Sequence, residues 1–184
     1  MPVVIGSKRE SDFTDPIGML SDCHRRIERF LRVLLTIATE QHGGTLTEEQ
    51  KVSLETALNY FRNAAPKHTA DEEESLFPRL RRLESPELQS TLVRIDALEH
   101  DHERADKGHQ EVDRLGREWL SRGRLDGEDA RRMTTLLTEL SELYERHIAL
   151  EDREVFPCAN RLLSPEDRTA VGAEMAERRG ARVR

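Results

Sequence analysis

The sequence predicts an all-α protein, folded as an antiparallel up-down four-helix bundle with a short fifth helix at its C-terminal end. Charged residues make up 35% of the chain and hydrophobic residues 36%, while glycine, proline and aromatic residues are few, a balance that suits long helices. Apolar residues recur at alternating steps of three and four along four long stretches. Short turn signals separate these stretches in pairs, so the paired helices should run antiparallel.

The first two helices have clear boundary signals. The first is expected over residues 15–43, because Pro16 favours the first helical position and two glycines end the stretch. The second is expected from a capping box that opens at Thr47 to about Leu83, with a bend at Pro66. Polar residues interrupt both apolar stripes, which are Ile17, Leu20, His24, Ile27, Leu31, Leu34 and Ala38, and Leu54, Leu58, Phe61, Ala65, His68, Glu72 and Leu76.

The remaining helices follow in the second half of the chain. Ser85-Pro86 opens the third helix, and Asp126 caps the fourth after a turn. Ser164 caps a short fifth helix, which ends near Gly180. Histidines again interrupt the stripes of the long helices, which are Ile95, Leu98, His102, Ala105, His109, Val112, Leu115 and Trp119, and Ala130, Met133, Leu137, Leu140, Tyr144, His147, Glu151 and Val155.

The chain divides into three parts. We expect a flexible N-terminal arm over residues 1–14, the bundle over residues 15–163, and a short helix with a basic tail over residues 164–184. The arginines of the tail are expected to be solvated, and they are Arg178, Arg179, Arg182 and Arg184.

The composition argues against several classes of protein. A net charge of −7 does not suit a nucleic-acid binder held by phosphate contacts. No apolar stretch approaches the roughly 20 residues of a membrane span, and the N-terminal arm lacks the apolar core of a signal peptide. The cysteines, Cys23 and Cys158, form no disulfide framework. We therefore expect a cytoplasmic monomer or homodimer that binds neither nucleic acid nor membrane.

One helical stretch occurs twice in the chain. The segment from His68 to Glu87 aligns without a gap to the segment from His147 to Glu166, and ten of the twenty aligned positions are identical. Each copy opens with His-x-x-x-Glu and contains Phe-Pro. On a helix, the His and Glu of this motif lie on one face about 6 Å apart, where both can contact a metal ion.

Counting from the turns extends this motif to a six-residue set. Each of four stripe histidines lies 18 to 20 residues from the turn end of its helix, so all four should fall in one layer of the bundle. Two glutamates lie one turn further along the same inward faces. The set is His24, His68, Glu72, His102, His147 and Glu151.

Such a set cannot stay buried without partners, because a lone buried carboxylate costs several kcal/mol. Imidazole and carboxylate ligands without thiolate suit iron, manganese or zinc. Two glutamates that could each bridge favour two metals, each with about two histidines and with an oxo or hydroxo bridge from solvent. Positions left open on a redox metal would take O2, NO or peroxide.

The full pattern resembles the hemerythrin-like family, also called the HHE cation-binding domain, over about residues 15–163. The resemblance implies a four-helix bundle around a non-haem di-iron centre, in preference to manganese or zinc. It makes the six residues of the set the iron ligands. Oxygen-carrying members have a second histidine one turn from the first on the third helix, whereas this chain has Leu98 and Asp106 there. The resemblance therefore favours sensing, detoxification or iron-centre repair over oxygen carriage.

Three further residues are candidates for supporting roles. Glu28 lies four residues after His24, and Asp106 four after His102, so each could be an extra ligand, orient an imidazole, or be ordinary surface charge. Tyr144 lies one turn before His147 on the inward face. It could act catalytically as a hydrogen-bond donor or redox partner, or be a core tyrosine with a satisfied hydroxyl.

Several functions remain open from the sequence. The first hypothesis is a di-iron protein that binds or reacts with O2, NO or peroxide. The alternatives are a di-iron oxidase or oxygenase that acts on an organic substrate, iron storage or donation without catalysis, and a purely structural bundle. Whether the protein is an enzyme is left undecided.

Overall fold

The computed structural model describes residues 10–181, and every regular element in that range is helical, which confirms the predicted all-α fold. Segments η1 and η3 are π-helical, and η2 is a short 3-10 helix. In chain order the elements are α1 (Pro16–Gln41), α2 (Glu48–Asn63), α3 (Ala65–Ala70), η1 (Asp71–Leu76), α4 (Phe77–Arg81), η2 (Pro86–Leu88), α5 (Gln89–Arg122), α6 (Gly127–Leu150), η3 (Glu151–Val155), α7 (Phe156–Leu162) and α8 (Pro165–Arg178).

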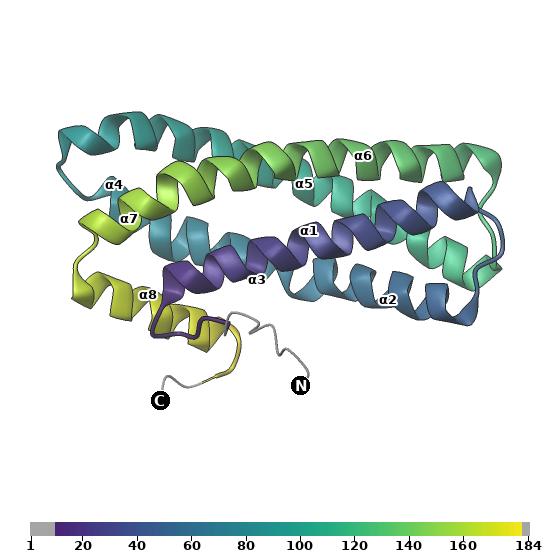
Figure 1. Cartoon of the computed structure of the whole chain (residues 1–184), viewed down its shortest axis with the longest axis horizontal. Helices are drawn as coiled ribbons and strands as arrows, with labels where there is room; N and C mark the ends of the chain where they lie inside the picture. The colour runs from purple at the N-terminus through teal and green to yellow at the C-terminus, as the bar shows by residue number, and fades with distance from the viewer. Residues whose placement is uncertain (1–9, 182–184) are drawn as a thin grey trace, which may run out of the picture.

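The four long helices form a helical bundle. Helices α1, α2, α5 and α6 pack in cyclic order, each against two of the others. Figure 1 shows them extending along the long axis of the molecule, with α8 folded back beside the start of α1. We call α1–α4 the first hairpin and α5–α7 the second. Between residues 10 and 181, no helix combines the length and apolar character that crossing a bilayer requires.

The predicted second helix is divided where proline interrupts it. Helix α2 ends at Asn63, and α3 begins at Ala65 with Pro66 in its first turn. Proline lacks a backbone N–H and clashes with the carbonyl four residues before it, which explains the break. The interruption at Ala64 lies four residues before His68, in the region where the sequence predicted a bend.

The bundle interior contains two apolar clusters with a polar layer between them. Along α1, Leu20 belongs to one cluster and Ile27 to the other, and the buried His24 lies between them. The same order repeats along α5 around His102. The polar layer is therefore enclosed by apolar side chains at both ends, which limits its contact with water.

Both copies of the duplicated stretch contain a widened, π-helical turn. In η1 the Phe77 N–H donates to the carbonyl of Glu72, five residues back, and in η3 the Phe156 N–H donates to the carbonyl of Glu151. A proline follows each phenylalanine. Because proline cannot continue the regular i-to-i−4 pattern, the wider turn accommodates it. Such turns are frequent at functional sites, and here each begins at or next to a glutamate of the polar layer.

The predicted N-terminal arm lies partly outside the described residues, which begin at residue 10. Residues 10–14 are held against the bundle. The Ser11 N–H donates to Asp22 Oδ2 at 2.6 Å, and Phe13 packs against an apolar cluster. A side chain in place of Gly172 on α8 would lie 2.0 Å from the Phe13 carbonyl oxygen, so glycine permits this close approach.

The prediction of a solvated arginine tail is wrong for Arg178 and Arg179. Both guanidinium groups contact Asp71, a fully buried residue of η1: Arg178 Nη1 lies 3.0 Å from Oδ1, and Arg179 Nη2 lies 2.5 Å from Oδ2. A buried carboxylate requires such partners, which explains why these arginines are not left in solvent. Arg182 and Arg184 lie outside the described residues.

Removing the carboxylate of Asp71 should destabilise the docking of α8. Asp71→Ala leaves two partly buried guanidinium groups without their shared partner, and we expect the free energy of unfolding to fall by about 3 kcal/mol. For a chain of this size, that corresponds to a melting temperature roughly 6–12 °C lower. Thermal unfolding measures the change. Arg117→Ala, which removes an exposed pair with Asp113, is the control and should change the stability by less than about 1 kcal/mol.

Candidate metal centre

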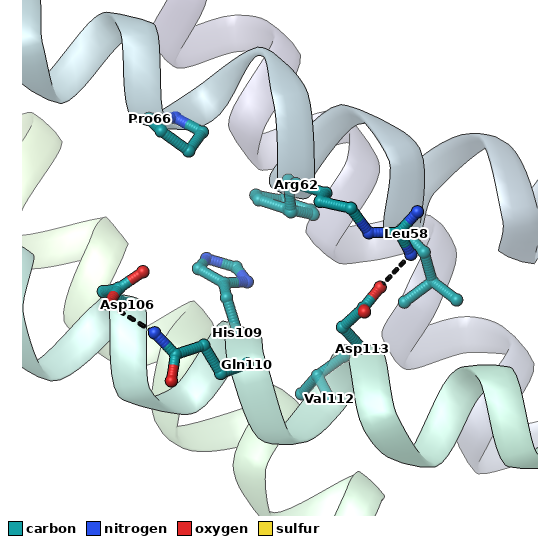
Figure 2. Close-up of a pocket in the computed structure, with 9 residues that line it drawn as sticks. Leu58, Arg62, Pro66, Asp106, His109, Gln110, Val112 and Asp113 are labelled. Carbon is teal, nitrogen blue, oxygen red and sulfur yellow. Dashed lines mark hydrogen bonds and ion pairs between the residues drawn. The ribbon is translucent and has the colours of Figure 1, made fainter.

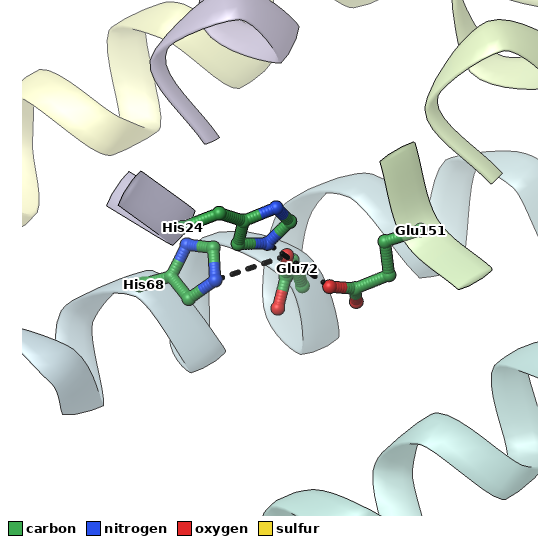
Figure 3. A group of neighbouring side chains, drawn as sticks. All are labelled: His24, His68, Glu72 and Glu151. Atoms are coloured by element: carbon green, nitrogen blue, oxygen red, sulfur yellow. Dashed lines mark ion pairs between the residues drawn. The ribbon is translucent and has the colours of Figure 1, made fainter. Parts of the chain in front are cut away.

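Six buried histidines and glutamates form the polar layer between the two apolar clusters. Each is at most 8% exposed, and together they come from both hairpins. They are His24, His68, Glu72, His102, His147 and Glu151. The structure thus brings together all six residues of the set that the sequence singled out. Figure 3 shows four of them, His24, His68, Glu72 and Glu151, converging from separate helical segments.

Glu72 lies between histidines of different hairpins. Its Oε1 is 3.4 Å from Nε2 of His68, four residues earlier on the same hairpin. Its Oε2 is 3.4 Å from Nε2 of His102, which belongs to α5 in the second hairpin. One carboxylate therefore faces two imidazoles through its two oxygens.

Glu151 has the equivalent position in the second copy. Its Oε2 is 3.3 Å from Nε2 of His147 on the same hairpin and 3.0 Å from Nε2 of His24 on α1. The two glutamates therefore make crossed contacts, each reaching a histidine of the opposite hairpin. This matches the pseudo-twofold relation that the duplicated sequence suggests.

The ligand atoms divide into two overlapping groups. In each group the atoms lie within 4.8 Å of one another. The first group contains His24, His68, Glu72 and Glu151, and the second contains His102, His147, Glu72 and Glu151. Each group thus has both histidines of one hairpin, and the two groups share both glutamates. Each of the two groups could therefore hold a metal ion.

The hydrogen bonding of these residues also fits a metal. Both carboxylate oxygens of Glu72 and of Glu151, together with His24 Nε2, are buried without a hydrogen-bond partner in the described part of the chain. Leaving such atoms unsatisfied costs several kcal/mol. A cation would give all of them a partner, so the residues present suit a metal centre better than a closed hydrogen-bond network.

The electrostatics of the polar layer favour the binding of a proton or a metal ion. Burial and the nearby charge of Glu151 raise the pKa of Glu72 to about 7. Burial opposes ionisation of Glu151 too, but the facing imidazoles of His147 and His24 hold its pKa well below the usual value. Burial alone would lower the pKa of His24, yet the carboxylates of Asp152 and Glu151, which face its two ring nitrogens, raise it to about 10. Metal ions that bind Nε2 would displace such protons.

Two carboxylates orient imidazoles from the side away from the cluster. Glu73 Oε1 lies 2.8 Å from His102 Nδ1, and Asp152 Oδ1 lies 3.1 Å from His24 Nδ1. A carboxylate there fixes the Nδ1–H tautomer and turns Nε2 toward the centre. Sequence reasoning missed both residues. The available signal was that each directly follows a glutamate of the cluster, at the same position of the duplicated stretch.

Comparison with known proteins identifies the family. Residues 15–159 match the family model of the Hemerythrin HHE cation binding domain. The chain belongs to this family. It is also 32% identical over 178 residues to an uncharacterized protein of Haemophilus influenzae, a match that covers 96% of each chain. The resemblance that the sequence motif suggested is therefore confirmed, and the buried histidine and glutamate groups belong to a cation-binding domain.

Two of the carboxylates expected beside the HHE domain's histidines lie elsewhere. Glu28 and Asp106 are exposed, and Asp106 accepts a hydrogen bond from Gln110 at 2.7 Å. Glu28 and Asp106 lie on the side of their histidines that faces the hairpin turns, whereas Glu72 and Glu151 lie on the side away from those turns. The structure brings Glu73 and Asp152 to the imidazoles instead.

Tyr144 lies beside the HHE centre and contacts the imidazole of His109, which is partly buried. Its ring centroid is 6.1 Å from that of His147, and its hydroxyl is 3.2 Å from Nε2 of His109. His109 stacks on Phe61, with centroids 4.1 Å apart. The Tyr144 hydroxyl is therefore satisfied by His109, and both side chains line a cavity that reaches His102.

Removing the orienting carboxylates should weaken metal binding by the HHE domain. Glu73→Gln and Asp152→Asn keep the shape of the side chains but remove the charge that fixes the imidazole tautomers. We expect each to lower metal affinity about 10- to 100-fold, measured by competition with a chelator. Glu154→Gln is the matched control, because Glu154 lies in the π-helical segment of Asp152 but pairs with Arg94 at the surface. Equal affinities in all three variants would contradict this role.

The partly buried His109 should make the stability of the HHE domain pH-dependent. Burial lowers its pKa to about 4. The unfolded chain takes up this proton near the ordinary value of about 6.5, so stability should fall as the pH drops from about 6.5 to 4. The contribution at stake is roughly 3 kcal/mol. His109→Phe removes it, and unfolding titrations of both proteins should differ progressively across this range. A constant difference would contradict the assignment.

Proposed function

We propose that this HHE domain holds two non-haem iron ions and that the centre binds or reacts with O2, NO or peroxide. The observation that carries the proposal is the sharing of Glu72 and Glu151 between two groups of ligand atoms. A single ion would not need two complete histidine pairs on opposite sides of the same carboxylates. In this proposal the long helices form an antiparallel up-down four-helix bundle, in a protein of the cytoplasm.

The chain's own residues account for the positioning. Four Nε2 atoms converge on two glutamates, and Glu73 and Asp152 fix two of the imidazoles from behind. The apolar clusters on both sides of the layer restrict water. Iron bound there would supply open coordination positions and one-electron chemistry toward a small ligand. Four nitrogen and two carboxylate ligands do not fill the coordination of two such ions, which leaves those positions available.

The proposal is tested by metal analysis and visible spectroscopy of the full-length protein. We expect about two iron ions per chain and a visible absorption band that forms when the reduced protein meets O2 and persists under vacuum. A band that disappears under vacuum would indicate reversible carriage instead. A fully stable protein that binds no iron when iron is supplied would refute the proposal.

One observation favours a second candidate, a di-iron oxidase acting on an organic substrate. The cavity that contains Tyr144 and His102 has a volume of about 140 Å³, enough for a very small organic molecule. Substrate-dependent O2 consumption, lost in Tyr144→Phe at unchanged iron content, would support this candidate over the first.

A further inference from the structure

The last helix, α8, is attached to the π-helical turn that carries Glu72. Arg178 and Arg179, at the C-terminal end of α8, both donate hydrogen bonds to the carboxylate of Asp71. Arg178 also donates to the hydroxyl of Ser75 at 2.8 Å. Asp71 and Ser75 are fully buried, one residue before Glu72 and three residues after it. Helix α8 therefore contacts η1 on both sides of a residue of the metal centre.

A further ion pair links α8 to the backbone of the same turn. The guanidinium group of Arg79, on α4, donates twice to the carboxylate of Glu174 on α8, at 3.0 and 2.7 Å. The Nη1 atom of Arg79 also donates to the backbone carbonyl of Ser75, at 2.8 Å. One arginine thus joins α8, α4 and the main chain of η1.

The second copy of the duplicated stretch has different side chains at these places. The positions of Asp71, Ser75 and Arg79 are occupied there by Leu150, Glu154 and Cys158. Leu150 packs against an apolar cluster. An apolar side chain in place of a buried ion pair is often neutral or stabilising. Stability alone therefore does not explain why the first copy has a buried carboxylate with two arginines.

The carboxylate of Glu72 depends on its backbone for its position. Both of its oxygens are buried without a hydrogen-bond partner among the described residues. The backbone itself forms a π-helical turn, a rare geometry in which the Phe77 N–H donates to the Glu72 carbonyl. Metal ligands must be held to within about 0.5 Å of the binding geometry. Contacts that fix Asp71 and Ser75 therefore also fix the residue between them.

We propose that Asp71, Ser75, Arg178 and Arg179 are positioning residues for Glu72, so that the docking of α8 and metal binding strengthen each other. The proposal rests on metal binding at the centre, which is part of the proposed function, but not on the metal being iron. Coupling between two equilibria is reciprocal. Bound metal should therefore hold α8 in place by the same factor by which docked α8 raises the metal affinity.

The charge of the arginines separates positioning from simple electrostatics. Removing two positive charges beside η1 would, through charge alone, raise the affinity of the centre for a cation. Loss of positioning lowers that affinity. In the double variant Arg178→Ala/Arg179→Ala we expect the affinities for Fe²⁺, under anaerobic conditions, and for Zn²⁺ to fall about tenfold or more. Competition with a chelator measures both affinities.

Two variants are controls for lost ion pairs and lost stability. Arg62→Ala removes an arginine whose ion pair with Asp113 joins α2 to α5, as Figure 2 shows, and not α8 to η1. Leu46→Ala shortens a buried side chain in the segment before α2, which lowers stability by creating a cavity. Both variants should keep the metal affinity of the wild type, even where the melting temperature falls.

Hydrogen exchange of the α8 amides tests the reciprocal effect without any substitution. Local opening of α8 should become rarer when metal binds, so exchange in the wild type should slow by about tenfold or more. In the double arginine variant, metal should change the exchange of α8 by less than about twofold, because the contacts that link α8 to Glu72 are gone.

The outcomes distinguish this coupling from the proposed function. Unchanged or increased metal affinity in the double variant would overturn the coupling, and so would α8 exchange in the wild type that does not respond to metal. If the chain binds Zn²⁺ but not Fe²⁺, the proposed function fails while zinc decides the coupling. A chain that binds neither ion overturns both. If the double variant does not fold, Arg179→Gln carries the affinity comparison.

Discussion

Replacing Glu151 with alanine is expected to reduce the bound metal from about two ions per chain to fewer than one. Glu151 belongs to both groups of ligand atoms, so its loss removes a ligand from each ion. Glu72 occupies the equivalent position, and Glu72→Ala should have a similar effect. Metal analysis of protein purified and reloaded under identical conditions measures the loss. Two ions retained in both variants would mean that the carboxylates do not bridge.

Matched variants separate loss of a ligand from loss of the fold. Glu154→Ala lies three residues after Glu151 in the same π-helical segment, but its side chain is 45% exposed and pairs with Arg94. It should keep the full metal content. Glu151→Gln preserves the size of the side chain, so a low metal content with an unchanged helical circular dichroism spectrum would assign the effect to the carboxylate charge.

Removing the metal is expected to lower the melting temperature by roughly 8–16 °C. A ligand that binds only the folded state contributes about 4 kcal/mol when present at 1,000 times its dissociation constant, and each kcal/mol corresponds to about 2–4 °C for a chain of this length. The buried carboxylate oxygens that lack hydrogen-bond partners explain why the metal-free state is the less stable one. Calorimetry before and after chelation, followed by reloading, measures the difference.

The same comparison in the Glu151→Ala protein is the control for metal removal. Because that variant should hold little metal, chelation should change its melting temperature by less than about 3 °C. Wild-type protein that melts at one temperature with and without metal would show that the six buried residues form a self-sufficient polar network.

Local sequence signals predicted the helices and the composition of the cluster well. The signals that bound the helices are local, because each involves only residues near it in the chain: the spacing of the apolar stripes, the capping box at Thr47 and the glycines at the turns. Helix α1, for example, was expected over residues 15–43 and is found over Pro16–Gln41. The positions of His24 and His102 followed from counting along regular helices from the turns. This counting works because helical rise per residue is nearly constant.

Other features depend on contacts that periodicity does not contain. The π-helical turns add a residue to one turn, which an average over a 3.6-residue period does not show. Glu73 reaches His102 across the bundle, and that contact depends on how the hairpins are rotated against each other. The docking of Arg178 and Arg179 on Asp71 joins residues more than a hundred positions apart. Local charge patterns therefore suggested a solvated tail where the structure has two partly buried arginines paired with the buried Asp71.

The crossed contacts of the two glutamates make the hairpins interdependent. Each hairpin contains two histidines and one glutamate, but each group of ligand atoms requires the glutamate of the other hairpin as well. A separate hairpin would therefore have an incomplete site, and two identical hairpins would complete each other's sites as a symmetric dimer. The duplicated stretch is thus consistent with an ancestral half-length chain that acted in pairs, later joined through the segment between α4 and α5 into one polypeptide.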